Sequence, residues 1–280
     1  MNKSEVSMCQ YKICQYDIKE VQKKLYLILL EFDRICRKNN IKYSLEGGTL
    51  LGAVKYKGFV PWDDDIDIIM ERKEYERFLK VCKRELNKDF YLQNNRSNKH
   101  FPLNYSKIHM NDTLYVQEST KHLRIHQGIF IDIFPVDHIF KPTLRLQIAL
   151  VGALSGARLV KLNRIYKKKE SVRVNKFKLL IYHGLALLPI SCINLFIDII
   201  CRMFNIFKSK YVYEVCNPNR NFKALNSSIY QELIELQFMG GNFMASKHYE
   251  DFLESRFGDI GRLPPEEERQ PSHKIIKCKL

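Results

Sequence analysis

The sequence predicts a mixed α/β (α+β) fold, in which helices flank a sheet, and two observations support this prediction. Residues 17–38 place apolar side chains at helical spacing between charged ones, which is typical of an amphipathic helix. Short apolar runs at 41–45, 65–70 and 128–137 are typical of strands, and helical patterns lie between them. This alternation indicates a sheet covered by helices.

Local signals predict the remaining elements. The glycine pair in 46–53 predicts a turn that leads into a short helix, and another helix is expected over 74–86. Residues 105–118 predict a hairpin whose turn lies at Asn111-Asp112. The stretch 141–210 is helical, at first basic and then strongly apolar.

Length and composition narrow the class of protein. The 280 residues, 45% of them hydrophobic, suit one large globular domain or two small ones. The eight cysteines are scattered without a Cys-x-x-Cys pair, which argues against zinc and redox sites. The first 20 residues lack the apolar region and cleavage site of a secretory leader. We therefore expect a cytoplasmic protein with free thiols.

The formal net charge of +15 is unevenly distributed. Nine Lys or Arg residues and one acid, Glu170, lie between Arg158 and Lys178. A basic surface favours anionic partners such as nucleotides, phosphorylated lipids, nucleic acid or the cytoplasmic membrane face. A solvated helix face explains such a run equally well. No recognition motif accompanies the charge, so we expect no nucleic-acid partner.

Residues 179–197 carry no formal charge over 19 positions, close to the roughly 20 that span a bilayer. Gly184 and Pro189 interrupt this run, and Asp198 and Arg202 follow it. We expect two core helices joined near Pro189. A helix in the membrane interface is the second interpretation, and a membrane span is the third.

Four carboxylates precede and enter the strand pattern of 65–70. In a strand, Asp65 and Asp67 point to the same face with Cα atoms roughly 6.6 Å apart, while Ile66 and Ile68 face the core. Like charges repel at such spacing, and burial increases the cost. Mg²⁺ typically takes one or two carboxylates together with substrate phosphate oxygens. We therefore expect a divalent metal to supply the compensating charge.

Three other interpretations apply to the same acids. A calcium-binding EF-hand loop needs glycine where Ile68 stands and a helix before Asp63, so we exclude it. A solvated acidic loop accounts for Asp63 and Asp64, but not for Asp65 and Asp67 among isoleucines. The Asp-x-Asp motif of a metal-dependent glycosyltransferase remains open.

The residues upstream favour a nucleotidyltransferase-type site. Gly47, Gly48 and Thr49 stand at the start of a short helix, where backbone N–H groups can approach a phosphate closely. The Asp-Ile-Asp sequence begins 16 residues after Thr49, and a lone acid, Asp132, lies on another predicted strand. Taken alone, Asp132 would be explained by a strand-end cap or an ordinary salt bridge.

Three blocks of the sequence resemble the LicD/fukutin-related family. Residues 43–68, "YSLEGGTLLGAVKYKGFVPWDDDIDI", resemble its Glu-Gly-Gly and Pro-Trp-Asp-x-Asp-hydrophobic-Asp motifs, and 128–137, "GIFIDIFPVD", resembles its next block. Residues 249–273 resemble its C-terminal block, so the resemblance extends from about 41 to 273. It implies a nucleotidyltransferase-like fold, a mixed sheet flanked by helices.

The resemblance implies a single domain over 15–275. This domain comprises a catalytic core (17–140), a helical basic/apolar insertion (141–210) and a C-terminal helix-loop segment that packs on the core (211–275). In the last segment, a helix is expected to stop near Gly258, before a Pro-rich loop.

The family's site residues can be placed on matching positions of this chain. The resemblance implies a metal pair at Asp65 and Asp67, and a third acid, Asp132, that completes the metal shell or accepts the acceptor hydroxyl's proton. It implies a phosphate-binding turn at Gly47, Gly48 and Thr49. Candidate phosphate contacts, with surface lysines as the alternative interpretation, are Lys55, Lys57 and Lys107.

The sequence departs from the family pattern at three places. Lys55-Tyr56 stands where Arg-His is usual, which loses the guanidinium fork that pairs with phosphate. Phe257-Gly258-Asp259 stands where Tyr-Gly-Asp is usual, and 237–241 lacks a Glu. These departures concern the identity of donor and acceptor more than the core chemistry.

The resemblance also implies an activity. The family moves a phospho-substituent, such as phosphocholine or phosphoribitol, from a CDP-linked donor to a sugar hydroxyl of lipopolysaccharide, capsule or teichoic acid. We expect in-line phosphoryl transfer with Mg²⁺ (or Mn²⁺) and release of CMP. The expected partners are that donor, a glycan or lipid-linked glycan acceptor, and an anionic membrane surface to which the protein attaches peripherally from the cytoplasm. A glycosyltransferase and a non-catalytic, membrane-docked scaffold are the alternatives.

Overall fold

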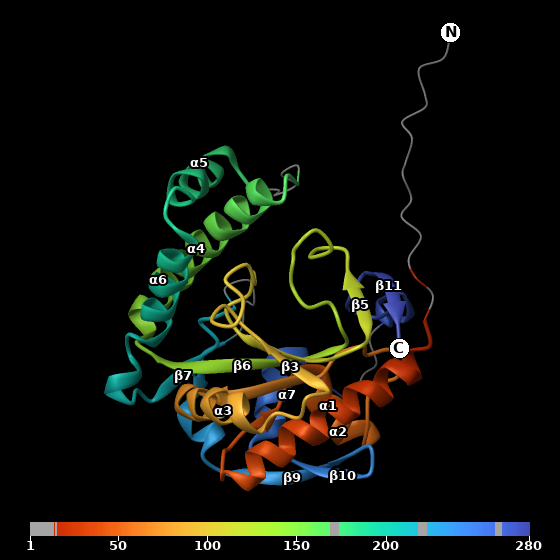
Figure 1. Cartoon of the computed structure of the whole chain (residues 1–280). Coiled ribbons are helices and arrows are strands. Elements are labelled where there is room, and N and C mark those ends of the chain that lie inside the picture. The colour runs from red at the N-terminus through yellow and green to blue at the C-terminus, as the bar shows by residue number, and fades with distance from the viewer. Residues whose placement is uncertain (1–13, 15, 169–173, 218–222, 261–264) are drawn as a thin grey trace.

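The computed structural model describes residue 14 and residues 16–168, 174–217, 223–260 and 265–280. These residues form a mixed sheet with helices packed around it, so the predicted fold class is confirmed (Figure 1). Part of the predicted basic run (169–173) and part of the Pro-rich loop (261–264) lie outside the described residues. The seven described cysteines are free.

The main sheet has seven strands. Its central order is β1 (Ser44–Leu45), β2 (Asp67–Glu71), β6 (Phe130–Ile139), β4 (Ser106–Met110) and β3 (Phe90–Gln93). At the far end of β6, β7 (Tyr211–Tyr213) pairs with β6, and β8 (Leu225–Asn226) pairs with β7. Strands β2 and β6 run parallel, and the other described pairs of this sheet are antiparallel. Residues at matching positions of β2 and β6 therefore lie side by side.

Three helices pack on one side of the sheet: α1 (Ile18–Lys38), α2 (Gly47–Tyr56) and α3 (Arg72–Glu85) (Figure 1). Helix α1 begins after Asp17, whose carboxylate accepts a hydrogen bond from the Lys19 N–H at 2.9 Å, as an N-cap does. Its buried face consists of Val21, Leu25, Ile28, Leu29, Phe32 and Ile35. The helix predicted over 17–38 is confirmed, and the helix predicted over 74–86 begins two residues earlier.

Two strand predictions need correction. The run 41–45 forms a strand only over its last two residues, and β2 starts at Asp67, so Asp65 precedes the strand. The predicted hairpin over 105–118 is wrong, although the turn at Asn111-Asp112 is present. Strand β4 lies between β3 and β6, because the apolar run of β6 takes the edge that the hairpin needed. The partner of β5 (Leu114–Gln117) is β11 (Ile275–Lys279).

The C-terminal segment packs on the core beside α1 and α2. It contains the hairpin of β9 (Leu233–Phe238) and β10 (Gly241–Ser246), then α7 (Tyr249–Phe257). Gly258 follows α7 with a positive φ of 69°, so the predicted helix stop is confirmed. Four short 3₁₀ helices complete the described elements: η1 (Lys141–Thr143), η2 (Asn205–Phe207), η3 (Ser227–Tyr230) and η4 (Glu266–Glu268).

Three further helices form a projection that we call the arm: α4 (Leu144–Ile165), α5 (Lys176–Leu185) and α6 (Ile190–Arg202). Figure 1 shows the arm extending away from the sheet, on the side opposite to α1 and α3. Pro189 is the N-cap of α6, so the predicted break is confirmed. The expected core packing of 179–197 is confirmed for the buried face of α6, whereas α5, all of which is described, has no buried residue and packs through the partly buried Leu179, Tyr182 and Leu185.

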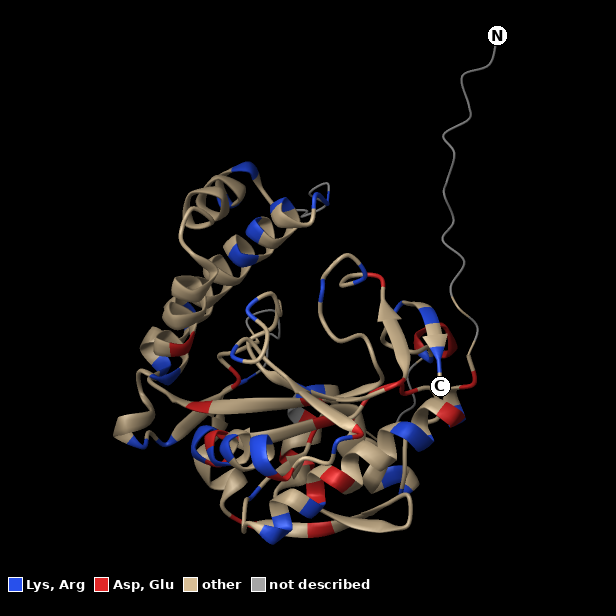
Figure 2. Cartoon of the chain, in the orientation of Figure 1, with Lys and Arg blue, Asp and Glu red and all other residues tan. Residues whose placement is uncertain are grey.

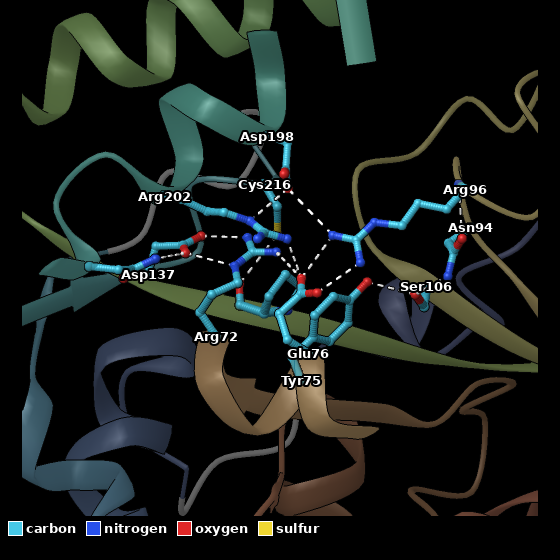
Figure 3. A network of polar contacts seen from close by, with 12 residues as sticks. Arg72, Tyr75, Glu76, Asn94, Arg96, Ser106, Asp137, Asp198, Arg202 and Cys216 are labelled. Carbon is cyan, nitrogen blue, oxygen red and sulfur yellow. Dashed lines mark hydrogen bonds and ion pairs between the residues drawn. The ribbon is translucent and has the colours of Figure 1, made fainter. Parts of the chain in front are cut away.

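A network of six charged side chains connects the arm to the core, and we call it the joint (Figure 3). The Arg72 guanidinium donates two hydrogen bonds, of 2.8 and 2.6 Å, to the fully buried carboxylate of Asp137. From α6, Arg202 pairs with Glu76 of α3, and Asp198 lies 3.8 Å from Arg96. Three positive and three negative groups balance, which lowers the cost of burying them.

Candidate active site

A cleft of about 660 Å³ opens between α2, the acidic loop before β2, α7 and the segment 265–272. Several of the predicted site residues line it: Gly47, Gly48, Lys55, Asp65 and Asp67. Its other lining side chains include aromatic and acidic groups: Tyr56, Trp62, Asp63, Phe257, Asp259 and Glu268. The structure therefore brings together most of the residues that the sequence predicted.

The glycine turn fits closely against the acids. Gly47 has a φ of +55°, and a Cβ built there would lie 2.9 Å from Asp67 Oδ2. A Cβ on Gly48 would overlap Asp63 Oδ2. Side chains at these two positions would push the carboxylates away, so the paired glycines are needed to hold Asp63 and Asp67 against the N-terminus of α2. This helix end carries partial positive charge that favours anions.

Thr49 has a different place from the one predicted. Its side chain is buried, and its Oγ1 accepts a hydrogen bond from the Asp67 N–H at 2.9 Å. The backbone N–H of Glu46 in turn donates to the Asp67 carbonyl at 3.0 Å. Thr49 therefore fixes the start of β2 rather than lining the cleft with the two glycines.

A row of charged residues crosses three neighbouring strands. Asp67 of β2 is the parallel partner of Asp132 of β6, and Lys107 of β4 is the antiparallel partner of Asp132. The buried Lys107 Nζ lies 2.6 Å from Asp132 Oδ1, and the Tyr105 hydroxyl donates to Asp132 Oδ2 at 3.4 Å. Asp132 thus lies beside Asp67 as predicted, and it also makes the salt bridge that was the alternative. Lys107 is paired inside the protein here, and its role as a phosphate contact stays a prediction.

Two acids of the loop have raised pKa values. Burial, together with the Asp65 and Asp67 carboxylates, raises the pKa of Asp63 well above its usual range. Burial also raises the pKa of Asp65, with Asp64 and Asp132 adding to the increase while His273 opposes it. Asp63 Oδ2 is buried and, among the residues that the structure describes, has no hydrogen-bond partner. Among the described residues, His273 Nδ1, 3.7 Å from Asp65 Oδ2, offsets only part of this repulsion.

Asp64 has the opposite character, and it is not a solvated loop residue. It is 1% exposed and accepts hydrogen bonds from Tyr115 Oη at 2.8 Å and from the Ser272 N–H at 3.0 Å. His273 Nδ1 lies 3.2 Å from the same carboxylate. Although burial opposes it, the bond from His273 lowers the pKa of Asp64. Burial likewise opposes the raised pKa of His273, to which the Asp64 hydrogen bond contributes most. Asp64 therefore ties the C-terminal segment to the acidic loop.

The donor set fits a hard divalent cation. Ligand atoms of Asp64, Asp65 and His273 lie within 4.8 Å of one another. Asp63 and Asp67 press against the neighbouring glycine turn. Convergent carboxylates with raised pKa values and an unpartnered buried oxygen are the arrangement that Mg²⁺ or Mn²⁺ would stabilise. Asp63, Asp64 and His273 extend the predicted group of Asp65, Asp67 and Asp132.

Two basic residues, Lys55 and Arg256, line the cleft, and a third, Lys57, lies outside it. Arg256 of α7 is buried and pairs with both Glu46 and Glu214, contacts that the sequence reasoning missed. The exposed Lys55 donates to the carbonyl of Ile260 at the rim. Lys57 is the C-cap of α2, where its φ is 51°, and it is not among the lining residues of the cleft, so its role as a phosphate contact stays a prediction.

Carboxylates on the neighbouring strands β2 and β6, beside a helix that begins with two glycines, form the arrangement expected of a nucleotidyltransferase-type site. Comparison with known families specifies the class further. Residues 40–147 match the family described as LicD/FKTN/FKRP, nucleotidyltransferase domain. The chain therefore contains a LicD-family nucleotidyltransferase domain over these residues.

Two curated proteins illustrate its relatives. The chain is 27% identical over 262 residues to "Lipopolysaccharide cholinephosphotransferase LicD" of Haemophilus influenzae, a match that covers 91% of this chain and 96% of that protein. It is 35% identical over 107 residues to an uncharacterized protein of Rickettsia prowazekii, which covers 31% of this chain and 39% of that protein. The first similarity therefore extends over the core, the arm and the C-terminal segment.

Proposed function

We propose that this protein transfers a substituted phosphate group from a CDP-linked donor to a sugar hydroxyl during the synthesis of a cell-surface polysaccharide, releasing CMP. Phosphocholine, phosphoribitol and phosphoglycerol are the candidate groups, and lipopolysaccharide, capsule and teichoic acid are the candidate products. The observation that carries the proposal is the cluster of Asp63, Asp65 and Asp67 against the glycine turn of α2. The name of the Haemophilus relative supports the choice of reaction.

The residues of the cleft suggest a division of labour. Gly47 and Gly48 present backbone and the positive end of α2 to the donor diphosphate. Asp63, Asp65 and Asp67 would hold Mg²⁺ or Mn²⁺, which when bound neutralises the charge of the diphosphate and of the leaving CMP. Asp132 lies next to Asp67 and is our candidate to complete the metal shell or to accept the proton of the acceptor hydroxyl. Lys107 and Tyr105 hold Asp132 in place.

The test is a measurement of CMP release from CDP-choline, CDP-ribitol and CDP-glycerol, with Mg²⁺ or Mn²⁺ and with a chelator. Asp67→Asn should lower turnover by about 10³-fold or more, because a bound metal is worth several kcal/mol of transition-state stabilisation. The variant should keep its thermal stability, since it removes one of several mutually repelling charges. The matched control is Asp112→Asn, an exposed turn residue with positive φ that Asn also adopts. A folded Asp67→Asn variant with full metal-dependent turnover would refute the proposal.

The two alternatives give different results in the same assays. A metal-dependent glycosyltransferase would turn over UDP- or GDP-sugars and leave the CDP-linked donors intact. A scaffold without catalysis would show no metal-dependent binding of CDP-choline by calorimetry. We place the reaction in the cytoplasm, at the inner face of the membrane, where a lipid-linked glycan acceptor would be within reach.

A further inference from the structure

The outer surface of the arm exposes large apolar side chains. Phe177 and Leu180 of α5 are 71% and 69% exposed, and Leu187 in the following turn is 78% exposed. Further exposed apolar residues of the arm are Leu146, Leu150, Ile165, Ile181, Leu195, Phe196, Ile199 and Met203. Single exposed apolar residues are ordinary, but a face made of so many marks a surface that meets something else.

Helix α6 shows that this face is separate from the packing surface inside the arm. Ile193, Ile197 and Cys201 are buried and belong to the hydrophobic cluster that α6 shares with α4. Leu195 and Ile199, four residues apart, lie on a different face of the same helix and are 57% and 52% exposed. The helix is therefore apolar both toward the arm's interior and toward the outside.

The charges of the arm are almost all of one sign. From Lys141 to Ile197 the sequence contains eleven Lys or Arg residues and a single acid, Glu170. Figure 2 shows basic residues toward the far end of the arm, where α4 ends and α5 begins, whereas red and blue mix over the core. The exposed ones among the described residues there include Arg164, Lys167, Lys176 and Lys178. Arg158 does not belong to this surface, because it is buried and donates to Asn104 Oδ1.

Helices α4 and α6, each with its flanking 3₁₀ turn, are long and apolar enough to cross a membrane by length and composition alone. Insertion of the arm would carry the basic residues at its far end through the hydrocarbon, at a cost of about 2.5–3.5 kcal/mol each. At the other end, Asp198 and Arg202 are held in the joint with the core. An arm that lies along the surface keeps its cations at the lipid phosphates and needs no such crossing.

We propose that the arm docks on the surface of an anionic lipid bilayer, with its exposed apolar side chains in the headgroup region and its lysines and arginines against lipid phosphates. A second copy of the chain is a poorer occupant, because a two-fold contact would place two basic faces against each other. The inference goes beyond the proposed function and does not depend on it.

Flotation of the full-length protein with vesicles of phosphatidylcholine, or of phosphatidylcholine with phosphatidylglycerol, tests the proposal. We expect binding to the anionic vesicles that weakens as salt rises. Combining Lys167→Gln, Lys176→Gln and Lys178→Gln should lower the partition coefficient by about fivefold for each lysine, on the order of 100-fold in total. The matched control changes three exposed lysines of α3 in the same way: Lys73→Gln, Lys80→Gln and Lys83→Gln.

A second pair of variants tests the apolar contribution. Leu180→Ser with Leu187→Ser should release the protein from anionic vesicles, whereas Leu27→Ser with Leu30→Ser, exposed on α1, should not. Three results would overturn the proposal: no binding to either vesicle at low salt, equal loss in arm and control variants, or resistance to alkaline carbonate extraction, which would indicate a span. Arm variants that abolish a dimer measured by light scattering, without changing flotation, would also overturn it and assign the face to a second copy.

Discussion

The core and the arm differ in how far they bury their apolar side chains. Helix α1 of the core buries a whole face, from Val21 to Ile35, beneath the sheet. Helix α5 of the arm buries none of its residues, all of which are described, and leaves Phe177 and Leu180 exposed. The buried face of α1 is covered within the chain, whereas α5 packs on the arm only through partly buried side chains and leaves its largest apolar residues uncovered.

The two regions also differ in how their charged side chains are arranged. In the core, cations stand beside acids, as in the pairs of Arg34 with Glu31 and Arg37 with Asp33, both at 2.7 Å. In the arm, basic residues accumulate with only two acids, Glu170 and Asp198, among them. The net charge of +15 is therefore unevenly distributed over the molecule, since the arm carries much of it.

Among the substitutions considered, disruption of the joint should lower the free energy of unfolding most. Arg72→Met removes the guanidinium that pairs with the fully buried Asp137. Among the described residues, Asn205 Nδ2 then remains as a hydrogen-bond donor to that carboxylate. We expect a loss of about 3–5 kcal/mol in the free energy of unfolding, because a buried charge loses its partner. Urea denaturation measures it. Arg77→Met, which removes the exposed pair with Glu74, should cost no more than about 1 kcal/mol. Equal costs for the two variants would show that the joint adds nothing.

Substitution of two glycines, one in the core and one in the arm, should change the stability by smaller amounts and in opposite directions. Gly48→Ala places a methyl group where Asp63 Oδ2 lies, and overpacking of this kind costs about 1–3 kcal/mol. Gly184→Ala in α5 meets no atom within 4 Å and should stabilise the protein by up to about 1 kcal/mol. Thermal denaturation reads both changes, and Gly48→Ala should also reduce CMP release. A Gly48→Ala protein as stable and active as the parent would mean that the acids do not press on the turn.

The smallest expected effect is a pH dependence at the joint. Burial raises the pKa of Glu76, but Arg96, Arg202 and Arg72 together outweigh burial and lower this pKa below its usual value of 4.5. The unfolded chain therefore binds this proton first, so the stabilisation is present above pH 4.5 and disappears as the pH falls through the lower folded value. Glu76→Gln should flatten the loss of stability in this acidic range, measured in chelator-containing buffer. The exposed Glu267→Gln should leave the curve unchanged, and a Glu76→Gln curve parallel to that of the parent would contradict the assignment.

Local periodicity was sufficient to predict an element such as α1, whose packing depends on one apolar face. Residues 17–38 alternate at helical spacing and follow an Asp that caps them, so the helix was predicted almost to the residue. The hairpin over 105–118 failed for a physical reason. Each strand pattern was correct, but β4 pairs with β6 and β5 with β11, and nothing in a local run specifies which distant strand takes its edge.

In the candidate site as well, local signals were predictable from the sequence, whereas contacts between distant residues were not. Asp65 and Asp67 were predicted as site residues from acids placed among isoleucines, which is a local signal, and Asp132 was added through its place in the resembling block. The strand prediction for Asp65 failed because the loop before Asp67 bends to bring Asp64 to Tyr115 and Ser272, contacts that span 51 and 208 residues. The pairing of Lys107 with Asp132 depends on strand register, which the sequence pattern did not provide. The Ser272-His273 pair was visible only as part of a resemblance, without a role.

The attachment of Ser272 and His273 to Asp64 has a consequence for biosynthesis. The acidic loop is translated roughly 200 residues before the side chains that hold it, and Arg256, which pairs with Glu46 at the back of the cleft, is also late. A chain still on the ribosome can fold its first helices and strands, yet its cleft lacks one wall until those last segments emerge. Proteolytic removal of the final 20 residues is therefore expected to release the acidic loop from Ser272 and His273 while leaving most of the fold in place.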